Sequence, residues 1–306
     1  MSARPDGPTT RTLAADEADA AEAGVEAAPT GVSAEIQLDG MRAARIGLDE
    51  AIFAHGKSPR QLAQILRLAA AQGSPLLITR LSTDKHAPLA ARWGARLDYC
   101  PVSSTAFFDP AAVRVPASDP SSVAIVAAGT SDAAVAREAA RTLEFNGVSS
   151  ALFIDVGVAG LWRLTRALPA IAAHPVVIAV AGMDAALPTV LGGLVGALII
   201  AVPTSVGYGV AAGGRAALDA ILASCSPGIP VMNIDNGYGA ACAALRALRA
   251  LRALRALGGA GVSAGAFVSA GAAEHQDSRN DSHRRSACSA VNSYPPRSPA
   301  SAQPPV

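Results

Sequence analysis

Short apolar runs and longer segments of helical length alternate along the second half of the chain. Five runs rich in valine, isoleucine and alanine are each followed by small or polar residues. Strands that alternate with helical segments are typical of right-handed βαβ units, which build a parallel sheet. We therefore expect a three-layer α/β domain over residues 119–257, with strands within 123–129, 151–157, 176–182, 198–203 and 229–235.

The preceding residues, 36–118, follow a weaker pattern. Ser58 and Pro59 are typical of a helix start, with serine as the N-cap and proline at the first helical position, and they predict a helix over 58–72. An apolar run predicts a strand over 75–81, and the remaining residues are expected to form loops. The pattern indicates a small α/β region ahead of the parallel-sheet domain.

Both ends of the chain are predicted to be disordered, because small and polar residues leave too little apolar surface to build a core. These segments are residues 1–35 and the low-complexity tail 258–306. Just before the tail, "ALRALRALRALRALGG" repeats every three residues, which nearly matches the period of a helix. We interpret it as a low-complexity repeat that extends the last helix, and a basic arm for a partner or nucleic acid is the alternative.

Composition excludes several classes of protein. Charged residues make up 16% of the chain and the net charge is +1, which argues against a nucleic-acid-binding surface. The four cysteines contain no C-x-x-C pair, so neither a metal site nor a disulfide framework is expected. The uncharged stretch 185–214 approaches the length of a membrane span, but Pro188 and three glycines interrupt it, and a buried strand gives the same pattern. Because the N-terminus has no apolar leader, we expect a cytoplasmic protein without membrane contact.

The loops after the expected strands contain the candidate binding residues, because ligands of open α/β sheets bind at the carboxyl ends of the strands. In residues 129–132, Gly-Thr-Ser-Asp, backbone N–H groups and hydroxyls at a helix start suit a phosphate, and plain N-capping is the alternative. The candidates are Gly129, Thr130, Ser131, Asp132, Asp155, Gly157, Gly182, Met183, Thr204, Ser205, Gly207, Asn233 and Asp235.

Two side chains are candidates for chemistry. Asp184 carries the only charge in a long apolar stretch, which suits ligand binding or proton transfer, and capping of the next helix is the alternative. Cys225 lies between a helical segment and the last expected strand, a position ordinarily on the edge of the sheet opposite the binding loops. From the residues alone, Cys225 is more typical of a small buried hydrophobe than of a nucleophile.

Several long motifs resemble one family. "DVGVAGLWRL", "VVIAVAGMDAALPTVLGGLVG", "IAVPTSVGYG" and "SCSPGIPVMNIDNGYGAA", together with "GTSD" and the upstream "RIGLDEAIFAHGKSPRQL", closely resemble the LarB family, which acts in synthesis of the nickel-pincer nucleotide cofactor of lactate racemase. The segment 181–203 is also similar to the PurE-like aminoimidazole ribonucleotide (AIR) carboxylases. The resemblance spans about residues 40–245 and implies a flavodoxin/PurE-like catalytic domain and a homo-oligomer, with an octamer as the expected state.

The LarB resemblance also implies an activity. LarB proteins carboxylate the pyridinium ring of nicotinic acid adenine dinucleotide with CO2 or bicarbonate and hydrolyse its phosphoanhydride, which gives pyridinium-3,5-biscarboxylic acid mononucleotide and AMP. The family's catalytic cysteine corresponds to Cys225, and Asp184 corresponds to an acidic position suited to proton transfer or substrate positioning. Ser131 and Asp132 are expected to hold phosphate or ribose. Hydrolysis of a phosphoanhydride is expected to use a magnesium ion, for which the sequence has no dedicated site, and no organic cofactor is expected.

The chain departs from the family pattern at three places, and two other functions stay open. Trp162 stands where family members often have histidine, Asp49-Glu50 replaces a Pro-Glu pair, and the Ala-Leu-Arg repeat is foreign to the family.

The second hypothesis for the function is a PurE-like AIR carboxylase, although residues 186–188, Ala-Leu-Pro, lack that group's histidine. The third is a nucleotide-binding module without catalysis.

Overall fold

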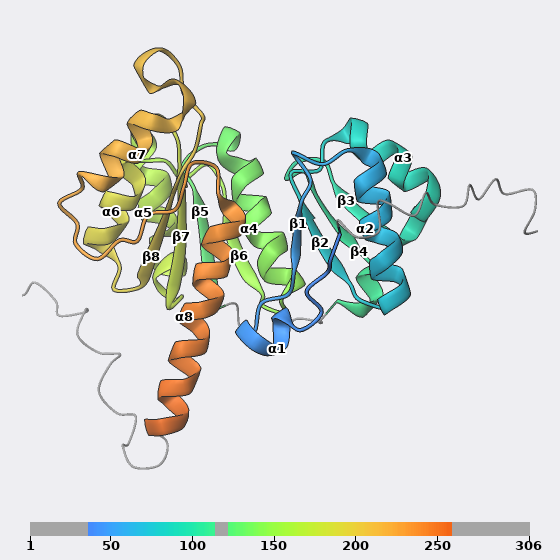
Figure 1. Ribbon diagram of the computed structural model, residues 1–306. Coiled ribbons are helices and arrows are strands. Elements are labelled where there is room, and N and C mark those ends of the chain that lie inside the picture. The colour runs from blue at the N-terminus through green and yellow to red at the C-terminus, as the bar shows by residue number, and fades with distance from the viewer. Residues whose placement is uncertain (1–35, 114–121, 259–306) are drawn as a thin grey trace, which may run out of the picture. The chain divides into compact units, whose positions relative to one another are not determined.

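The computed structural model describes residues 36–113 and 122–258 of the chain (Figure 1). The predictions for residues 1–35 and for the tail beyond Gly258 lie outside the described residues. Within the described part, the chain forms two separate four-stranded sheets, one on each side of the gap at 114–121.

The first sheet belongs to the N-terminal region and is mixed. Its strand order is β1-β2-β4-β3, in which β1 and β2 are parallel and the other pairs are antiparallel. The elements are α1 (Arg42–Ile46), β1 (Ala51–Phe53), α2 (Pro59–Gln72), β2 (Leu76–Thr79), α3 (Thr83–Trp93), β3 (Leu97–Cys100) and β4 (Thr105–Phe108), with short 3-10 turns at Gly94–Arg96 and Pro110–Ala112.

The predicted helix of this region is confirmed as α2. Ser58 Oγ accepts the N–H of Gln61 at 3.2 Å, and Gln61 Oε1 accepts the N–H of Ser58 at 2.9 Å, which forms a capping box. The buried residues Leu62, Ile65, Leu66 and Ala69 follow the spacing of one helix face and pack into the core with the sheet. The strand predicted at 75–81 is confirmed as β2. The expectation of loops elsewhere is wrong, since this region also forms α1, α3 and the strands β1, β3 and β4. These strands have only three or four residues each, too few to give a clear sequence pattern.

The second sheet is parallel, with the order β6-β5-β7-β8 (Figure 1). Buried residues alternate between its two faces: Val123 and Ile125 belong to one core cluster, and Ala124 and Val126 to the other. Helices α4 and α8 cover the first face, and α5, α6 and α7 cover the second, so the predicted three-layer α/β fold is confirmed. The elements are β5 (Val123–Ala127), α4 (Ala133–Phe145), β6 (Ser150–Phe153), α5 (Leu161–Ala172), β7 (Val176–Ala181), α6 (Ala186–Leu194), β8 (Leu198–Pro203), α7 (Arg215–Leu222) and α8 (Gly237–Gly258), with 3-10 turns at Thr130–Asp132, Val158–Gly160 and Gly209–Gly214.

The prediction of a fifth strand within 229–235 is wrong, because the segment does not form a full strand. This segment pairs with β8 at one bridge only, between Val231 and Ala201. Pro230 has no N–H to continue the ladder. Beyond the bridge the chain turns, since the side chain of Asn233 accepts the next backbone N–H at 2.8 Å and Asp235 has a left-handed φ of 57°. The segment therefore follows the edge of the sheet without becoming a strand.

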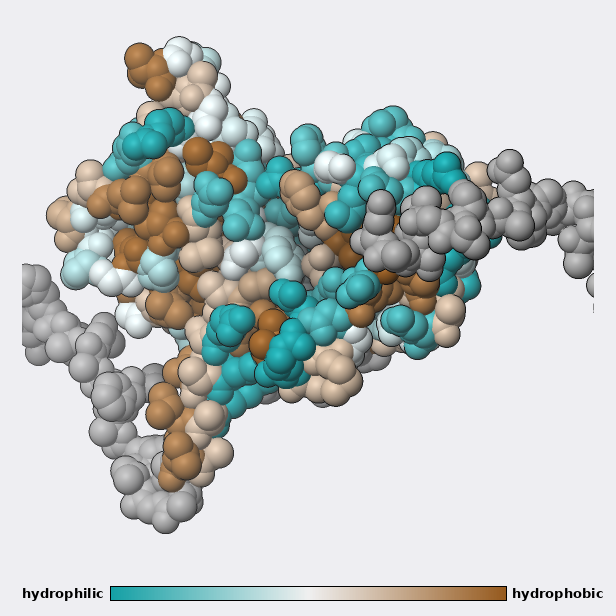
Figure 2. Space-filling view, viewed as in Figure 1, coloured by the Kyte–Doolittle hydropathy of each residue, from teal (hydrophilic) through white to brown (hydrophobic). Residues whose placement is uncertain are grey.

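The Ala-Leu-Arg repeat extends the last helix, as predicted. Leu245 and Leu248 of α8 are buried at 3% and 5% exposure, whereas Leu254 and Leu257 are 64% and 76% exposed. Three residues advance a helix by about 300° and not by a full turn, so each leucine is rotated by about 60° from the one before it. The leucines thus turn away from the core, and Figure 2 shows hydrophobic residues on the surface of the last turns.

The uncharged stretch 185–214 is divided between a helix, a strand and a 3-10 turn. Helix α6 has nine residues and β8 has six. Among the residues that the structure describes, no helix is both long and apolar enough to cross a membrane.

Candidate functional site

The loops at the carboxyl edge of the parallel sheet contact one another, as the strand-end rule predicts. Thr204 Oγ1, after β8, donates to Asp132 Oδ1, after β5, at 2.6 Å. The N–H of Ser205 donates to Asp235 Oδ1 at 2.8 Å, which joins the same loop to the segment before α8. These contacts fix residues that are far apart in the chain at one edge of the sheet.

The buried carboxylate of Asp132 stabilises the loops at this edge through hydrogen bonds. It is 3% exposed, and its second carboxylate oxygen accepts the N–H of Gly129 at 2.9 Å. Both carboxylate oxygens are therefore engaged within the protein. Thr130 and Ser131, the neighbours of Asp132, are exposed and available to a ligand.

Three of the predicted binding glycines permit close approach of neighbouring loops. A Cβ atom at Gly157 would lie 2.6 Å from the carbonyl oxygen of Ala128. At Gly182, a Cβ atom would overlap the carbonyl oxygen of Val206 and lie 2.7 Å from the hydroxyl of Thr204, and at Gly207 it would overlap another backbone carbonyl. The space beside each glycine is thus filled by the protein's own atoms.

Gly182→Ala is expected to lower the free energy of unfolding by about 2–4 kcal/mol, because the added methyl must displace backbone and hydroxyl oxygens in a packed loop. The control is Gly193→Ala in α6, where a Cβ meets open space, and it should raise the same free energy by about 0.5–1 kcal/mol. Urea denaturation measures both, and equal effects would contradict the packing described for Gly182.

Asp184 lies in the loop between β7 and α6, beside exposed Met183. Its Oδ1 accepts the N–H of Ala186 at 3.2 Å, so it contacts the start of the helix as in the capping alternative. Asp184 and Ala185 have left-handed φ angles of 63° and 51°, a conformation uncommon for residues other than glycine. The side chain remains exposed, so the carboxylate is also accessible to a ligand.

A separate hollow of about 370 Å³ is lined by Asp155 and Trp162 together with two arginines. Arg163 forms an ion pair with Asp155 at 2.5 Å, and Arg166 lies 5.2 Å from the centre of the Trp162 ring. Trp162 is 62% exposed. Trp162, where family members often have histidine, therefore provides an exposed aromatic ring that does not titrate, next to the guanidinium groups of Arg163 and Arg166.

Cys225 is exposed, so the expectation of a buried core thiol is wrong. It lies in the turn after α7. Its neighbours hold this turn against α6: Ser224 Oγ accepts the hydroxyl of Thr189 at 2.7 Å, and Ser226 Oγ donates to the carbonyl of Thr189 at 2.8 Å. The turn thus lies alongside the helix that begins two residues after Asp184.

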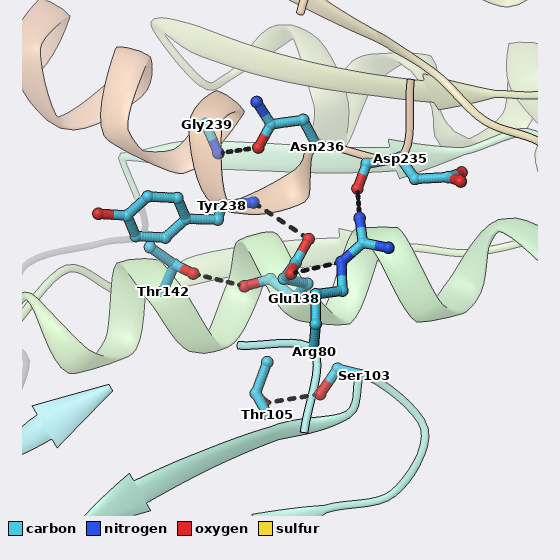
Figure 3. A network of polar contacts seen from close by, with 9 residues as sticks. All are labelled: Arg80, Ser103, Thr105, Glu138, Thr142, Asp235, Asn236, Tyr238 and Gly239. Atoms are coloured by element: carbon cyan, nitrogen blue, oxygen red, sulfur yellow. Dashed lines mark hydrogen bonds and ion pairs between the residues drawn. The ribbon is translucent and has the colours of Figure 1, made fainter. Parts of the chain in front are cut away.

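Two residues that sequence reasoning missed, Arg80 and Glu138, join the N-terminal region to the parallel-sheet domain (Figure 3). Arg80 follows β2, and its Nε lies 3.4 Å from Glu138 Oε1 on α4. A terminal nitrogen of Arg80 donates to the carbonyl oxygen of Asp235. Glu138 Oε2 in turn accepts the N–H of Tyr238 at 3.2 Å. An arginine directly after an apolar strand is the only sequence signal that could have indicated this contact.

Two hollows flank the Arg80–Glu138 pair, and both residues line each of them. The first, of about 210 Å³, is lined in part by the strand-end loops, and the second, of about 390 Å³, in part by the segment before α8. Predicted binding residues line both hollows. Ser131, Ser205 and Asp235 line the first. Asn233 lines the second, where His55 and Tyr238, which were not predicted, also lie. Cys225 lines neither of these two hollows.

Glu138 is 3% exposed, and this burial raises the pKa of its carboxyl, an effect that the Arg80 guanidinium partly opposes. A raised folded-state pKa means that the group stabilises the fold at low pH and that this contribution is lost as the pH rises through the raised pKa. Glutamine cannot titrate. The free energy of unfolding of Glu138→Gln, minus that of the wild type, is therefore expected to increase between pH 4 and pH 8.

Denaturation at several pH values measures this difference. Glu144→Gln, at an exposed position of the same helix, is the control and should show a nearly constant difference from the wild type. A difference for Glu138→Gln that falls with pH would contradict the role of burial.

Within residues 36–113 and 122–258, no three or more histidine, cysteine, aspartate or glutamate side chains lie together as a metal site would need. The described residues therefore do not fit a protein cage for magnesium. The magnesium ion stays a prediction.

The parallel sheet, its order and its glycine-rich strand-end loops define a PurE-like α/β domain. Residues 122–256 match the family model described as AIR carboxylase, and residues 33–109 match the one described as LarB/PurE-like N-terminal domain. The chain therefore belongs to the LarB family and carries a PurE-like domain.

One curated relative is an uncharacterized protein of Methanocaldococcus jannaschii. It is 49% identical over 120 residues, which cover 39% of this chain and 46% of that protein. The chain thus spans about half the length of the relative that it matches.

Proposed function

We propose that the protein carboxylates the pyridinium ring of nicotinic acid adenine dinucleotide and hydrolyses its phosphoanhydride, which yields pyridinium-3,5-biscarboxylic acid mononucleotide and AMP. The observation that carries this proposal is the pair of family matches together with Cys225, which is exposed in the turn "SCSPG". An exposed thiol is accessible to a substrate, whereas a buried thiol is not.

The chemistry gives the cysteine a specific role. A pyridinium ring is electron-poor and does not attack CO2. Addition of the Cys225 thiolate to a ring carbon removes the aromaticity and makes the neighbouring carbon nucleophilic, like that of an enamine. That carbon forms a bond to CO2, then loses its proton, and the sulfur departs with its electron pair as the ring becomes aromatic again. The net change replaces C–H by C–carboxylate and releases one proton, so no oxidant is needed.

Asp184 is our candidate acceptor of that proton. Its carboxylate is exposed in the loop that precedes α6, the helix that also contacts the turn of Cys225. In the second step, water attacks the phosphoanhydride, and we expect the exposed hydroxyls of Thr130 and Ser131 to donate hydrogen bonds to phosphate oxygens. We expect magnesium, the ion that commonly neutralises such phosphates, to enter with the substrate.

The test is a product assay with purified protein, nicotinic acid adenine dinucleotide, bicarbonate and magnesium, analysed by mass spectrometry. The expected products are AMP and a mononucleotide that is heavier than nicotinic acid mononucleotide by one carboxylate. Folded wild-type protein that forms neither product would overturn the proposal.

A second candidate is carboxylation of an aminoimidazole ribonucleotide, because the match over 122–256 is to the AIR carboxylase model itself. The Ala-Leu-Pro sequence at 186–188 weakens it, since the histidine of that group is missing, and it gives Cys225 no role. Turnover of aminoimidazole ribonucleotide in the same assay, in place of the dinucleotide, would favour this candidate. We also propose a homo-oligomer, with an octamer as the expected state, which light scattering after size-exclusion chromatography would measure.

A further inference from the structure

We infer that Arg80, supplied by the N-terminal region, binds a phosphate of the nucleotide at the hollow of about 210 Å³ beside the Arg80–Glu138 pair. The identity of the nucleotide rests on the proposed function. The phosphate contact rests on the geometry around Arg80.

Arg80 is held firmly in place. Its backbone has a left-handed φ of 54°, and its guanidinium contacts the Glu138 carboxylate and the carbonyl oxygen of Asp235. The side chain is 38% exposed, so it is neither buried in the protein nor free in solvent. A guanidinium fixed in this way loses little conformational entropy when it binds a ligand.

The guanidinium retains donors for a ligand. Nε faces Glu138 and one terminal nitrogen faces Asp235, while the other terminal nitrogen points away from both residues (Figure 3). Arginine has five N–H donors in a planar fork, which matches the oxygens of a phosphate. The free side of the fork therefore suits a phosphate oxygen.

The charges around Arg80 favour a sugar phosphate over a bare anion. The Glu138 carboxylate pairs with the Arg80 guanidinium, and Asp235, whose backbone carbonyl accepts from Arg80, adds a second carboxylate to the lining of the same hollow, so the surroundings are not strongly positive. Ser131 and Ser205 line the first hollow and offer hydroxyl donors for a phosphate, and the Asp235 carboxylate can accept a hydrogen bond from a ribose hydroxyl.

The experiment measures binding, so that it is separate from turnover. Isothermal titration calorimetry compares nicotinic acid mononucleotide with nicotinic acid riboside, which lacks the phosphate, on wild-type protein and on Arg80→Gln and Arg80→Lys. The wild type is expected to prefer the mononucleotide, and Arg80→Gln should reduce that preference by roughly 10- to 100-fold, the usual effect of a charge-assisted hydrogen bond. Arg80→Lys should lose part of it, because lysine keeps the charge but not the fork.

Two controls separate a phosphate contact from a loss of folding. Arg215→Gln removes an exposed arginine paired with Asp219 and should bind both ligands as the wild type does. The double variant Arg80→Gln/Glu138→Gln leaves no unpaired buried charge and should lose the same phosphate preference. An equal loss of affinity for both ligands, or a wild type that does not prefer the phosphate, would overturn the inference. Normal binding without turnover would overturn only the proposed function.

Discussion

Cys225→Ser is expected to lower the rate of carboxylated mononucleotide formation by roughly 1,000-fold or more, since a serine hydroxyl neither adds to the ring nor leaves it as readily as a thiolate does. Cys225 is exposed, and the substitution removes no buried contact, so the variant should fold as the wild type does. Product formation under saturating bicarbonate, followed by mass spectrometry, measures the loss.

The matched control is Cys100→Ser. Cys100 is a free thiol of the N-terminal region, in β3, and should keep the wild-type rate. An adduct of the substrate's pyridinium moiety on Cys225, detected in the quenched wild type and missing from Cys225→Ser, would support the covalent route. A Cys225→Ser variant with the wild-type rate would show that the sulfur is not the nucleophile.

Asp132→Asn is expected to lower the free energy of unfolding by about 2–3 kcal/mol. The carboxylate accepts hydrogen bonds through both oxygens, from Thr204 at 2.6 Å and from the Gly129 N–H at 2.9 Å. An amide has only one oxygen, so one of these two donors would face an NH2 group in either orientation. The loop that carries Ser131 would lose its support, and nucleotide affinity should fall along with stability.

The control for this prediction is Asp219→Asn, which alters the exposed Arg215–Asp219 pair and should change the stability by less than about 0.5 kcal/mol. Denaturation curves of both variants provide the measurement. If Asp132→Asn were as stable as Asp219→Asn, the buried contacts of Asp132 would not support the loop as described.

Much of the fold followed from local sequence patterns. The strands β5, β6, β7 and β8 lie in mostly apolar runs, and the strand-end rule predicts that Asp132, Thr204, Ser205 and Asp235 lie at one edge of the sheet, as their contacts show. The start of α2 could also be predicted from the sequence, because a capping box depends on residues only three positions apart.

The remaining features depend on contacts that are distant in sequence or on single backbone groups. Arg80 and Glu138 are 58 positions apart, and no periodicity relates them. The run at 229–235 has the apolar character of a strand, but Pro230 lacks the N–H that a ladder needs. The exposure of Cys225 depends on how its turn packs against α6, which local pattern does not indicate.

The most direct test of the account is the fate of carbon-13 bicarbonate in the presence of nicotinic acid adenine dinucleotide. We predict that the mononucleotide product gains the labelled carbon as a new ring carboxylate, while AMP appears in equal amount and carries no label. A mononucleotide without label, or a label found only on an aminoimidazole ribonucleotide, would contradict the proposal that this LarB-family protein carboxylates a pyridinium ring.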